Sequence, residues 1–284
     1  MKFLDVKTDF AFKKVFGSED SKDILIDFLN AVIVFENNQK IQSLAIVDPY
    51  NIPMLKGMKD TYVDVKAELV DGGHVIIEMQ VLSHEGFEKR ILYNAAKKYS
   101  AQLKKGDGYH LLNPVIALTI TDFELFPEQQ ELISHYKLLE KKHLIEYSDD
   151  IELIFIELPK FTKTAEQLQT IQDKWLYFIK NAGSLEYIPK NQTKEIEKAY
   201  QIANEANFSE EELDLQHRKR DWIYIQKSSI ELATKTGKEQ GLAEGIEEGR
   251  VEGRVEGIEA GKRAEKQQMV KKMYLAEVDI ELIK

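Results

Sequence analysis

The stretch that decides the fold is "TYVDVKAELVDGGHVIIEMQV", residues 61–81. Two runs of aliphatic residues flank a turn sequence, Asp-Gly-Gly, so the stretch predicts a β-hairpin. The two strands also carry Asp64, Glu78 and Gln80. Acids and amides are mostly exposed in proteins, so their presence here needs an explanation. The placement of these polar side chains decides whether the hairpin is only structural or holds a site.

The length of the turn sets which of these side chains meet, because a slip of one residue moves every side chain of a strand to the other face. A two-residue loop at 71–72 would send Asp64 and Glu78 to opposite faces. A three-residue loop at 71–73 would place Asp64 opposite Gln80, with Glu78 as its diagonal neighbour. The sequence permits both turns.

If the three polar groups converge, two carboxylates lie close together in a partly buried site. Such carboxylates repel each other, and one must become protonated unless a cation lies between them. Mg²⁺ takes oxygen ligands and keeps several waters, so Asp64, Glu78 and the backbone carbonyl of Met79 would suffice. Such a metal can activate water and neutralise charge on a phosphodiester, while the amide of Gln80 can hydrogen-bond the water or a phosphate oxygen. The alternative is that all three are solvated residues of an ordinary hairpin.

Composition limits the class of protein. The chain has 284 residues, 43% of them hydrophobic and 10% aromatic, which is ordinary for a globular protein with one sizeable core and a second region. It has no cysteine, which excludes a disulfide framework and cysteine-based zinc sites and favours an intracellular setting. Because neither a leader nor a long apolar run is present, we expect a cytoplasmic protein without a membrane span. The net charge of −10 argues against broad electrostatic coating of nucleic acid but permits a local basic patch.

Helices precede strands along the first part of the chain. "TDFAFKKVFG" and "SKDILIDFLNAVI" predict two amphipathic helices, the first capped by Thr8. A strand ended by Pro49 and the hairpin follow, then a helix at about 85–105 with a basic character, and two strands in "PVIALTITDF" and "IELIFIELP". This order predicts an α/β fold, a mixed sheet with helices packed on it.

The composition changes beyond about residue 164, where strand patterns fade and Lys, Glu, Gln and Leu dominate. We predict a core at 1–163, a helical region at 164–236 and a repeat-bearing tail at 237–284. The aromatic residues expected to anchor the helical region by packing are Trp175, Tyr177, Phe178, Trp222 and Tyr224.

In the tail, glycine recurs at every fourth position from Gly237 to Gly261. Each glycine inside a helix costs up to about 1 kcal/mol relative to alanine, so the tail could be a flexible linker. The intervening residues are compatible with a helix, on which a step of four residues drifts by roughly 40°. The glycines would then form a slow spiral stripe on which a second helix could pack closely. The tail therefore predicts self-association, with a disordered linker as the alternative.

Five motifs occur in order along the chain: "TDFAFKKVFG", "DILIDFLNAV", "DVKAELVDGGHVIIEMQV", "FEKRILYNAAKKYSAQLKKGDGY" and "NPVIALTITDFELF". Together with the glycine repeat, they resemble the Rpn family of recombination-promoting nucleases, also called putative transposases, of the PD-(D/E)XK superfamily. The resemblance covers nearly the whole chain. It implies a restriction-endonuclease-like α/β core followed by an α-helical C-terminal region.

The resemblance also implies roles for individual residues. Asp64 corresponds to the metal-binding aspartate, Glu78 to the acid of an E-x-Q motif, and Gln80 to the residue that stands where the wider superfamily has lysine. Asp9, in the first helix, is implied as an acid that reaches the site. The alternative for Asp9 is that an acid in the first turn of a helix stabilises the helix dipole.

The basic helix at about 85–105 supplies the candidates for substrate binding. Arg90, Tyr93 and Asn94 lie within about one helical turn, and Gln102 follows about two turns later. The resemblance favours the presentation of Arg90 and Gln102 to a phosphate. The alternative is a solvated amphipathic helix.

The leading hypothesis is a cytoplasmic DNA endonuclease that depends on Mg²⁺ or Mn²⁺ and forms a homo-oligomer through its C-terminal region. A role in recombination, or in processing mobile-element or phage-related DNA, comes from the resemblance alone. The competing hypothesis is a catalytically weak module that binds nucleic acid or protein and works through oligomerisation. An RNA-directed nuclease is a third possibility.

Overall fold

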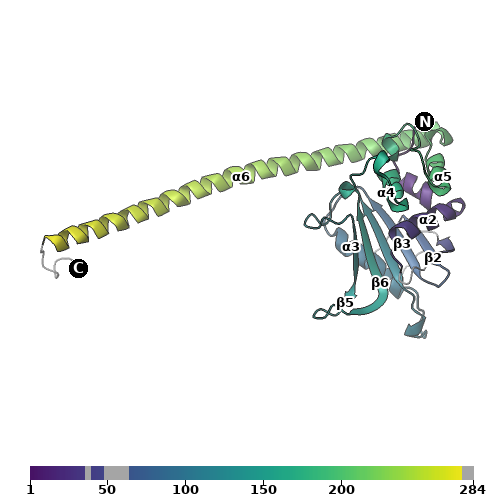
Figure 1. Ribbon diagram of the computed structural model, residues 1–284, viewed down its shortest axis with the longest axis horizontal. Helices are drawn as coiled ribbons and strands as arrows, with labels where there is room; N and C mark the ends of the chain where they lie inside the picture. Colours follow the sequence, from purple (N-terminus) through teal and green to yellow (C-terminus); the bar gives the residue numbers. More distant parts are fainter. Residues whose placement is uncertain (36–39, 48–63, 277–284) are drawn as a thin grey trace. The chain divides into compact units, whose positions relative to one another are not determined.

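The computed structural model describes residues 1–35, 40–47 and 64–276. Within these residues one mixed sheet forms in the order β1-β2-β3-β4-β6-β5 (Figure 1). Its strands are β1 (Leu44–Val47), β2 (Val65–Leu69), β3 (His74–Gln80), β4 (Val115–Thr121), β5 (Ile133–Leu139) and β6 (Glu146–Glu157). The pairs β3·β4 and β4·β6 are parallel, and the other neighbours are antiparallel.

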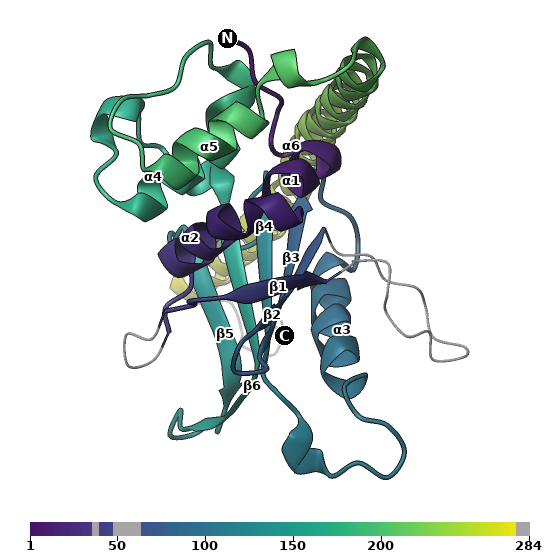
Figure 2. The same ribbon diagram turned by 90° about the vertical axis from the view of Figure 1, so that its right-hand side faces the viewer.

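Helices cover both faces of the sheet (Figures 1 and 2). The α-helices are α1 (Asp9–Phe16), α2 (Lys22–Val32), α3 (Phe87–Ser100), α4 (Ile171–Asn181), α5 (Lys194–Ile202) and α6 (Glu210–Leu275). The predicted fold class, a mixed sheet flanked by helices and followed by a helical C-terminal region, is confirmed. The strand β5 was not predicted, and the residues around Pro49, with residues 61–63 of the quoted stretch, lie outside the described residues.

The strand alternation assigns the two faces of β3. Val75, Ile77 and Met79 belong to the main core, which also contains the buried residues of α1, α2, α4 and α5. Ile76 belongs to a second cluster with Phe87 and other buried residues of α3. Glu78 and Gln80 follow Ile76 at a spacing of two, so they belong to the face that α3 covers.

The hairpin β2·β3 forms, but both predicted registers are wrong. Ala67 pairs with Val75, and Leu69 and Gly73 are joined by a backbone hydrogen bond of 2.8 Å, which leaves a loop at 70–72. Gly72 adopts a φ of +88°, a conformation that favours glycine. The side chain of Asp71 accepts a hydrogen bond from the Gly73 amide at 3.0 Å. The aspartate and the first glycine therefore shape the turn one residue earlier than the three-residue loop that we predicted.

The helices α4 and α5 pack with α2 and share the main core. Trp175 is fully buried, and its indole N–H donates to the carboxylate of Asp27 at 2.8 Å. The structure thus divides the chain elsewhere than the predicted boundaries at 163 and 236: one compact unit spans Met1–Tyr224 and the other spans Ile225–Lys284. Trp222 and Tyr224 are 50% and 72% exposed, so the prediction that they anchor the packing was wrong.

The helix α6 includes all the repeated glycines, so the described part of the tail is helical. A methyl group added at any of these glycines would meet no atom of the described residues within 4 Å outside the neighbouring backbone of the helix. The close approach that glycine permits is therefore not used by contacts inside the described chain.

No helix in the described residues is long and apolar enough to span a membrane.

The first prediction concerns the turn of the hairpin. An alanine at position 72 would have to keep the left-handed backbone conformation of Gly72. Its methyl group would lie 2.9 Å from the side-chain oxygen of Asn113. We expect Gly72→Ala to destabilise the core by at least the roughly 1–2 kcal/mol that this conformation costs other residues. Urea denaturation followed by the fluorescence of the buried Trp175 measures the change.

Gly106→Ala is the matched control, since Gly106 also has a positive φ, +101°, but a methyl group there would meet nothing within 4 Å. The Gly72 variant should lose more stability than this control. Equal losses would show that the contact with Asn113 does not constrain the turn.

Candidate active site

Asp64 lies at the end of the hairpin that is remote from the turn. Val65 is the Cα partner of Ile77, yet the Asp64 amide also donates to the Ile77 carbonyl at 3.0 Å. Two residues thus oppose one, which is the arrangement of a β-bulge. A carboxylate oxygen of Asp64 accepts a hydrogen bond from the Met79 amide at 2.7 Å. The bulge and this bond fix the Asp64 carboxyl group against the backbone of β3.

The helix α1 brings two charged side chains to Asp64. The Lys13 ammonium lies 2.8 Å from the carboxylate of Asp9 and 3.8 Å from that of Asp64. Burial and a hydrogen bond with Asp9 raise the pKa of Asp64 to about 8. The same hydrogen bond is the main cause that lowers the pKa of Asp9. Near neutral pH, a protonated Asp64 therefore donates to an ionised Asp9.

Asp9 and Lys13 are presented by the first turns of α1. Thr8 caps this helix, its hydroxyl accepting from the Ala11 amide at 3.4 Å. Asp9 is thus both an acid in the first helical turn, where it stabilises the dipole, and a direct contact of Asp64. Both predicted roles of Asp9 are compatible with this geometry.

The helix α3 contacts the other acid of the candidate site. The Arg90 guanidinium forms an ion pair with Glu78 and a hydrogen bond of 2.9 Å with the side-chain oxygen of Gln80. Burial raises the pKa of Glu78, although the charge of Arg90 and a hydrogen bond from Asn94 act in the opposite direction. Glu78 is therefore a buried carboxyl group held by one cation and one amide of the same helix.

Both ends of the Gln80 amide are engaged within the chain. Its oxygen accepts from Arg90, and its nitrogen donates to the Leu82 carbonyl at 2.8 Å. Gln80 therefore orients Arg90 in this structure. A direct contact of Gln80 with water or phosphate would require one of these bonds to open.

The charged partners of Asp64 and Glu78 come from helices that cover opposite faces of the sheet, α1 and α3. Met79 lies between the two groups, since it follows Glu78 in the chain and its amide binds Asp64. The structure thus gathers Asp9, Asp64, Glu78, Gln80 and Arg90 around the end of β3, with Met79 as the link.

Gln102 lies away from this group. Its amide brackets the backbone of Asn113, accepting from the nitrogen and donating to the oxygen, both at 2.9 Å. Asn113 neighbours Gly72 in the turn, and β3 runs about 20 Å from the turn to the site. Gln102 therefore ties the end of α3 to the hairpin turn. Tyr93 is partly buried on α3, one turn after Arg90.

Two residues of the site were given no role in the sequence analysis. Lys13 follows Asp9 by four residues on α1, and this spacing could have predicted their ion pair. Asn94 follows Arg90 by four residues on α3, so it faces Glu78 as Arg90 does. Asn94 is buried, and its side-chain oxygen has no hydrogen-bond partner among the described residues.

The donor set suits a hard divalent cation bound partly through water. In the part of the chain that the structure describes, no three acidic or histidine side chains gather closely enough to hold a metal by themselves. Mg²⁺ requires only one or two carboxylates beside its waters, and two carboxyl groups that share a proton form a site where a cation can replace that proton. Asp64 with Asp9 or Glu78, and the carbonyl of Met79, are the candidate ligands.

Comparison with known proteins identifies the class of the chain. The model of a family described as "PD-(D/E)XK nuclease family transposase" matches residues 6–233. The chain therefore belongs to this family, and its mixed sheet with flanking helices is consistent with the restriction-endonuclease-like fold. Nucleases of this superfamily generally use divalent metal ions. No curated protein and no solved structure matches the chain.

The second prediction follows from the raised pKa of Asp64. A carboxyl group whose pKa rises on folding stabilises the protein at low pH, and this stability is lost as the pH rises towards the folded pKa, here about 8. Asp64→Asn keeps the hydrogen-bonding shape of the protonated acid without titrating. With the metal chelated, we expect the difference in melting temperature, variant minus native protein, to increase as the pH rises from about 4 to about 8.

Asp20→Asn, at an exposed aspartate, is the control, and its melting curve should stay parallel to that of the native protein. If the Asp64 variant also stays parallel over the whole range, the two carboxyl groups do not share a proton.

Proposed function

We propose that the protein is a metal-dependent DNA endonuclease that hydrolyses phosphodiester bonds. The observation that carries the proposal is the pair formed by the largely buried Asp64 and the exposed Asp9, joined through Met79 to the buried Glu78, in a chain of the nuclease family. Buried carboxyl groups with raised pKa values cluster at functional sites, because burial opposes their charge and moves the pKa towards the range in which proton transfer and metal binding take place.

A divalent cation, Mg²⁺ or Mn²⁺, would supply a Lewis acid for the phosphodiester and a water of lowered pKa. Asp64 and Glu78 would hold it together with the carbonyl of Met79. Asp9 would accept a proton or orient a water beside Asp64, since the two already exchange a hydrogen bond. Arg90 lies on α3, on the opposite face of the sheet from Asp9, and its guanidinium would contact a phosphate oxygen.

A second candidate function is a nucleic-acid-binding module with weak catalysis or none. The observation that favours it is the internal engagement of Gln80, because both ends of its amide are bound within the protein. A role in recombination or in mobile-element DNA processing agrees with the family's description as a transposase.

The third prediction separates enzyme from binding module. The native protein should nick or linearise supercoiled DNA with Mg²⁺ or Mn²⁺, and chelation should stop the reaction. Asp64→Ala and Glu78→Ala should each reduce the rate by roughly 100-fold or more, since loss of an outer contact of a metal site already costs about 10- to 100-fold.

Glu88→Ala is the matched control, an exposed acid in the first turn of α3 that belongs to neither group. It should cleave at the native rate, and circular dichroism should show the same fold for all variants. Cleavage by Asp64→Ala at the native rate would point to a contaminating nuclease and would reject the proposed site.

We also propose that the protein forms a homo-oligomer through the glycine repeat of α6. Its glycines offer a row without side chains and without contacts inside the described chain, which suits the close approach of a second helix. Two-fold association would suit an enzyme that cleaves both strands of a duplex, since it presents two sites.

The fourth prediction tests this row. In a monomer, replacing Gly245, Gly249 and Gly253 by alanine should stabilise the helix by up to about 1 kcal/mol at each position. If a second helix packs on the row, the added methyl groups should also weaken association. Sedimentation of the full-length protein at several concentrations should then show a lower mean mass for the triple variant.

Replacing Glu244, Glu248 and Glu252 by glutamine is the control, because it changes the neighbouring row and keeps the glycines. If the alanine variant associates as strongly as the native protein, or if both are monomers, the repeat is not the association element.

A further inference from the structure

The Lys13 side chain brings a positive charge to the acid pair from α1. Its ammonium contacts Asp9 at 2.8 Å and lies 3.8 Å from Asp64. The side chain is 29% exposed, so the ammonium is within reach of a ligand that approaches from the solvent. Lys13 thus lies between the largely buried Asp64 and the exposed Asp9, within reach of the surface.

The first turns of α6 lie against α1 within the same compact unit. The Thr8 hydroxyl, at the cap of α1, donates to the side chain of Gln216 at 2.9 Å, and Gln216 is buried. One turn earlier on α6, Glu212 lies 3.9 Å from the Lys14 ammonium. These contacts identify the face of α6 that meets the helix bearing Asp9 and Lys13.

Lys219 lies on this same face of α6. It follows Glu212 by seven residues and Gln216 by three, a spacing that keeps residues on one side of a helix. Lys219 is exposed, and its ammonium is 5.2 Å from the ring centroid of Trp222, which limits its freedom. Its charge also contributes to lowering the pKa of Asp9, so it acts on the acid pair.

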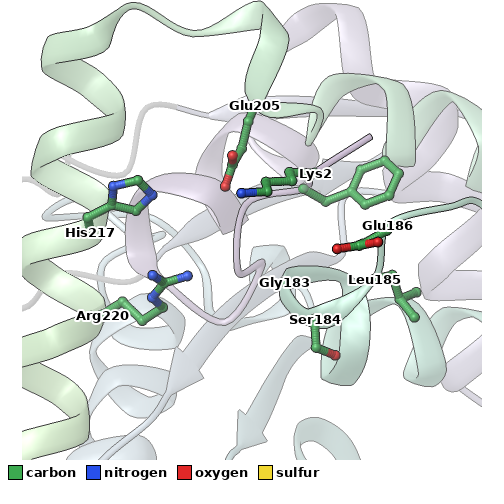
Figure 3. A pocket seen from close by; sticks show the side chains of 9 residues that line it. Lys2, Gly183, Ser184, Leu185, Glu186, Glu205, His217 and Arg220 are labelled. Carbon is green, nitrogen blue, oxygen red and sulfur yellow. The ribbon is translucent and has the colours of Figure 1, made fainter.

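The adjacent face of α6 has a different character. His217 and Arg220 line a cavity of about 310 Å³ together with Lys2, Glu186 and Glu205 (Figure 3). The two acids offset the charges of Lys2 and Arg220, so this face has no net attraction for an anion. Lys219 lies on the face that meets α1, where the acid of the same face, Glu212, is paired with Lys14.

We propose that Lys13 and Lys219 form a phosphate-contact surface that guides the DNA backbone from the acid pair onto α6. The proposal rests on the proposed function, because it takes DNA as the substrate. A chain with a net charge of −10 repels a polyanion at long range, and phosphate binding then depends on cations placed next to the site. Lys13 and Lys219 meet this need on the α1 side, as Arg90 does on the α3 side.

The test measures the binding of a short labelled DNA duplex by fluorescence anisotropy at several salt concentrations, with the metal chelated so that binding is separated from cleavage. Each phosphate contact contributes about 0.9 to the slope of log affinity against log salt concentration. Lys13→Met and Lys219→Met should each lower the slope by about one, and the double variant by about two.

Lys14→Met is the matched control on α1, because Lys14 contacts Glu212 and not the acid pair. Lys235→Met is the control on α6, since Lys235 is exposed and lies in the other compact unit. Both controls should retain the native slope. Lys13→Arg and Lys219→Arg keep the charge and should restore it, which distinguishes a phosphate contact from a loss of folding.

An unchanged slope in the double variant, or no binding by the native protein, would overturn the inference. Cleavage of supercoiled DNA with Mg²⁺ is measured in parallel. If the native protein cleaves while the slopes are unchanged, the proposed function stands without this surface. If the slopes fall as expected but the native protein does not cleave, the surface stands and the proposed endonuclease activity fails.

Discussion

The hydrogen bond from the Met79 amide to the Asp64 carboxyl group is the contact on which the candidate site depends. It attaches an acid from the edge of a bulge to β3, the strand that joins the antiparallel and parallel parts of the sheet. Because the backbone of β3 is fixed on both sides, the position of Asp64 is fixed with it. The resulting burial of Asp64 opposes its ionisation, and the proton that Asp64 keeps is shared with a second acid, Asp9.

Much of the fold could be predicted from the sequence, because it follows from local patterns. The alternation in β3 and the helical spacing in α1 and α2 each depend on residues that are close in the chain. The hairpin register could not be predicted, because "DGG" allows several turns and the turn packs against Asn113, a residue before β4 that is distant in the chain. The strand β5 escaped prediction because its segment, "ISHYKLL", is partly exposed and lacks a clear apolar alternation.

The candidate site was predictable to the extent that the resemblance and the spacing placed its acids. Arg90 could be placed as a member of the helix but not as a partner of Glu78, because that contact depends on how α3 packs against β3. Gln102 shows the same limit: α3 carries it towards the hairpin turn, away from Gln80. Direction along a packed helix is a tertiary property, and a linear motif does not contain it.

The identity of residue 80 has a physical reason in this arrangement. The Arg90 guanidinium contacts both Glu78 and the neutral oxygen of Gln80, and an amide can accept this bond without changing the net charge of the group. A lysine at position 80 would place a second cation beside Arg90 and would compete with it for the single carboxylate of Glu78. With glutamine at position 80, the cations of the site belong to the helices: Arg90 lies on α3 and Lys13 lies on α1. The charge near the reacting groups is therefore set by how the helices pack, so a shift of α1 or α3 would change the electrostatics of the site without any change in the acids.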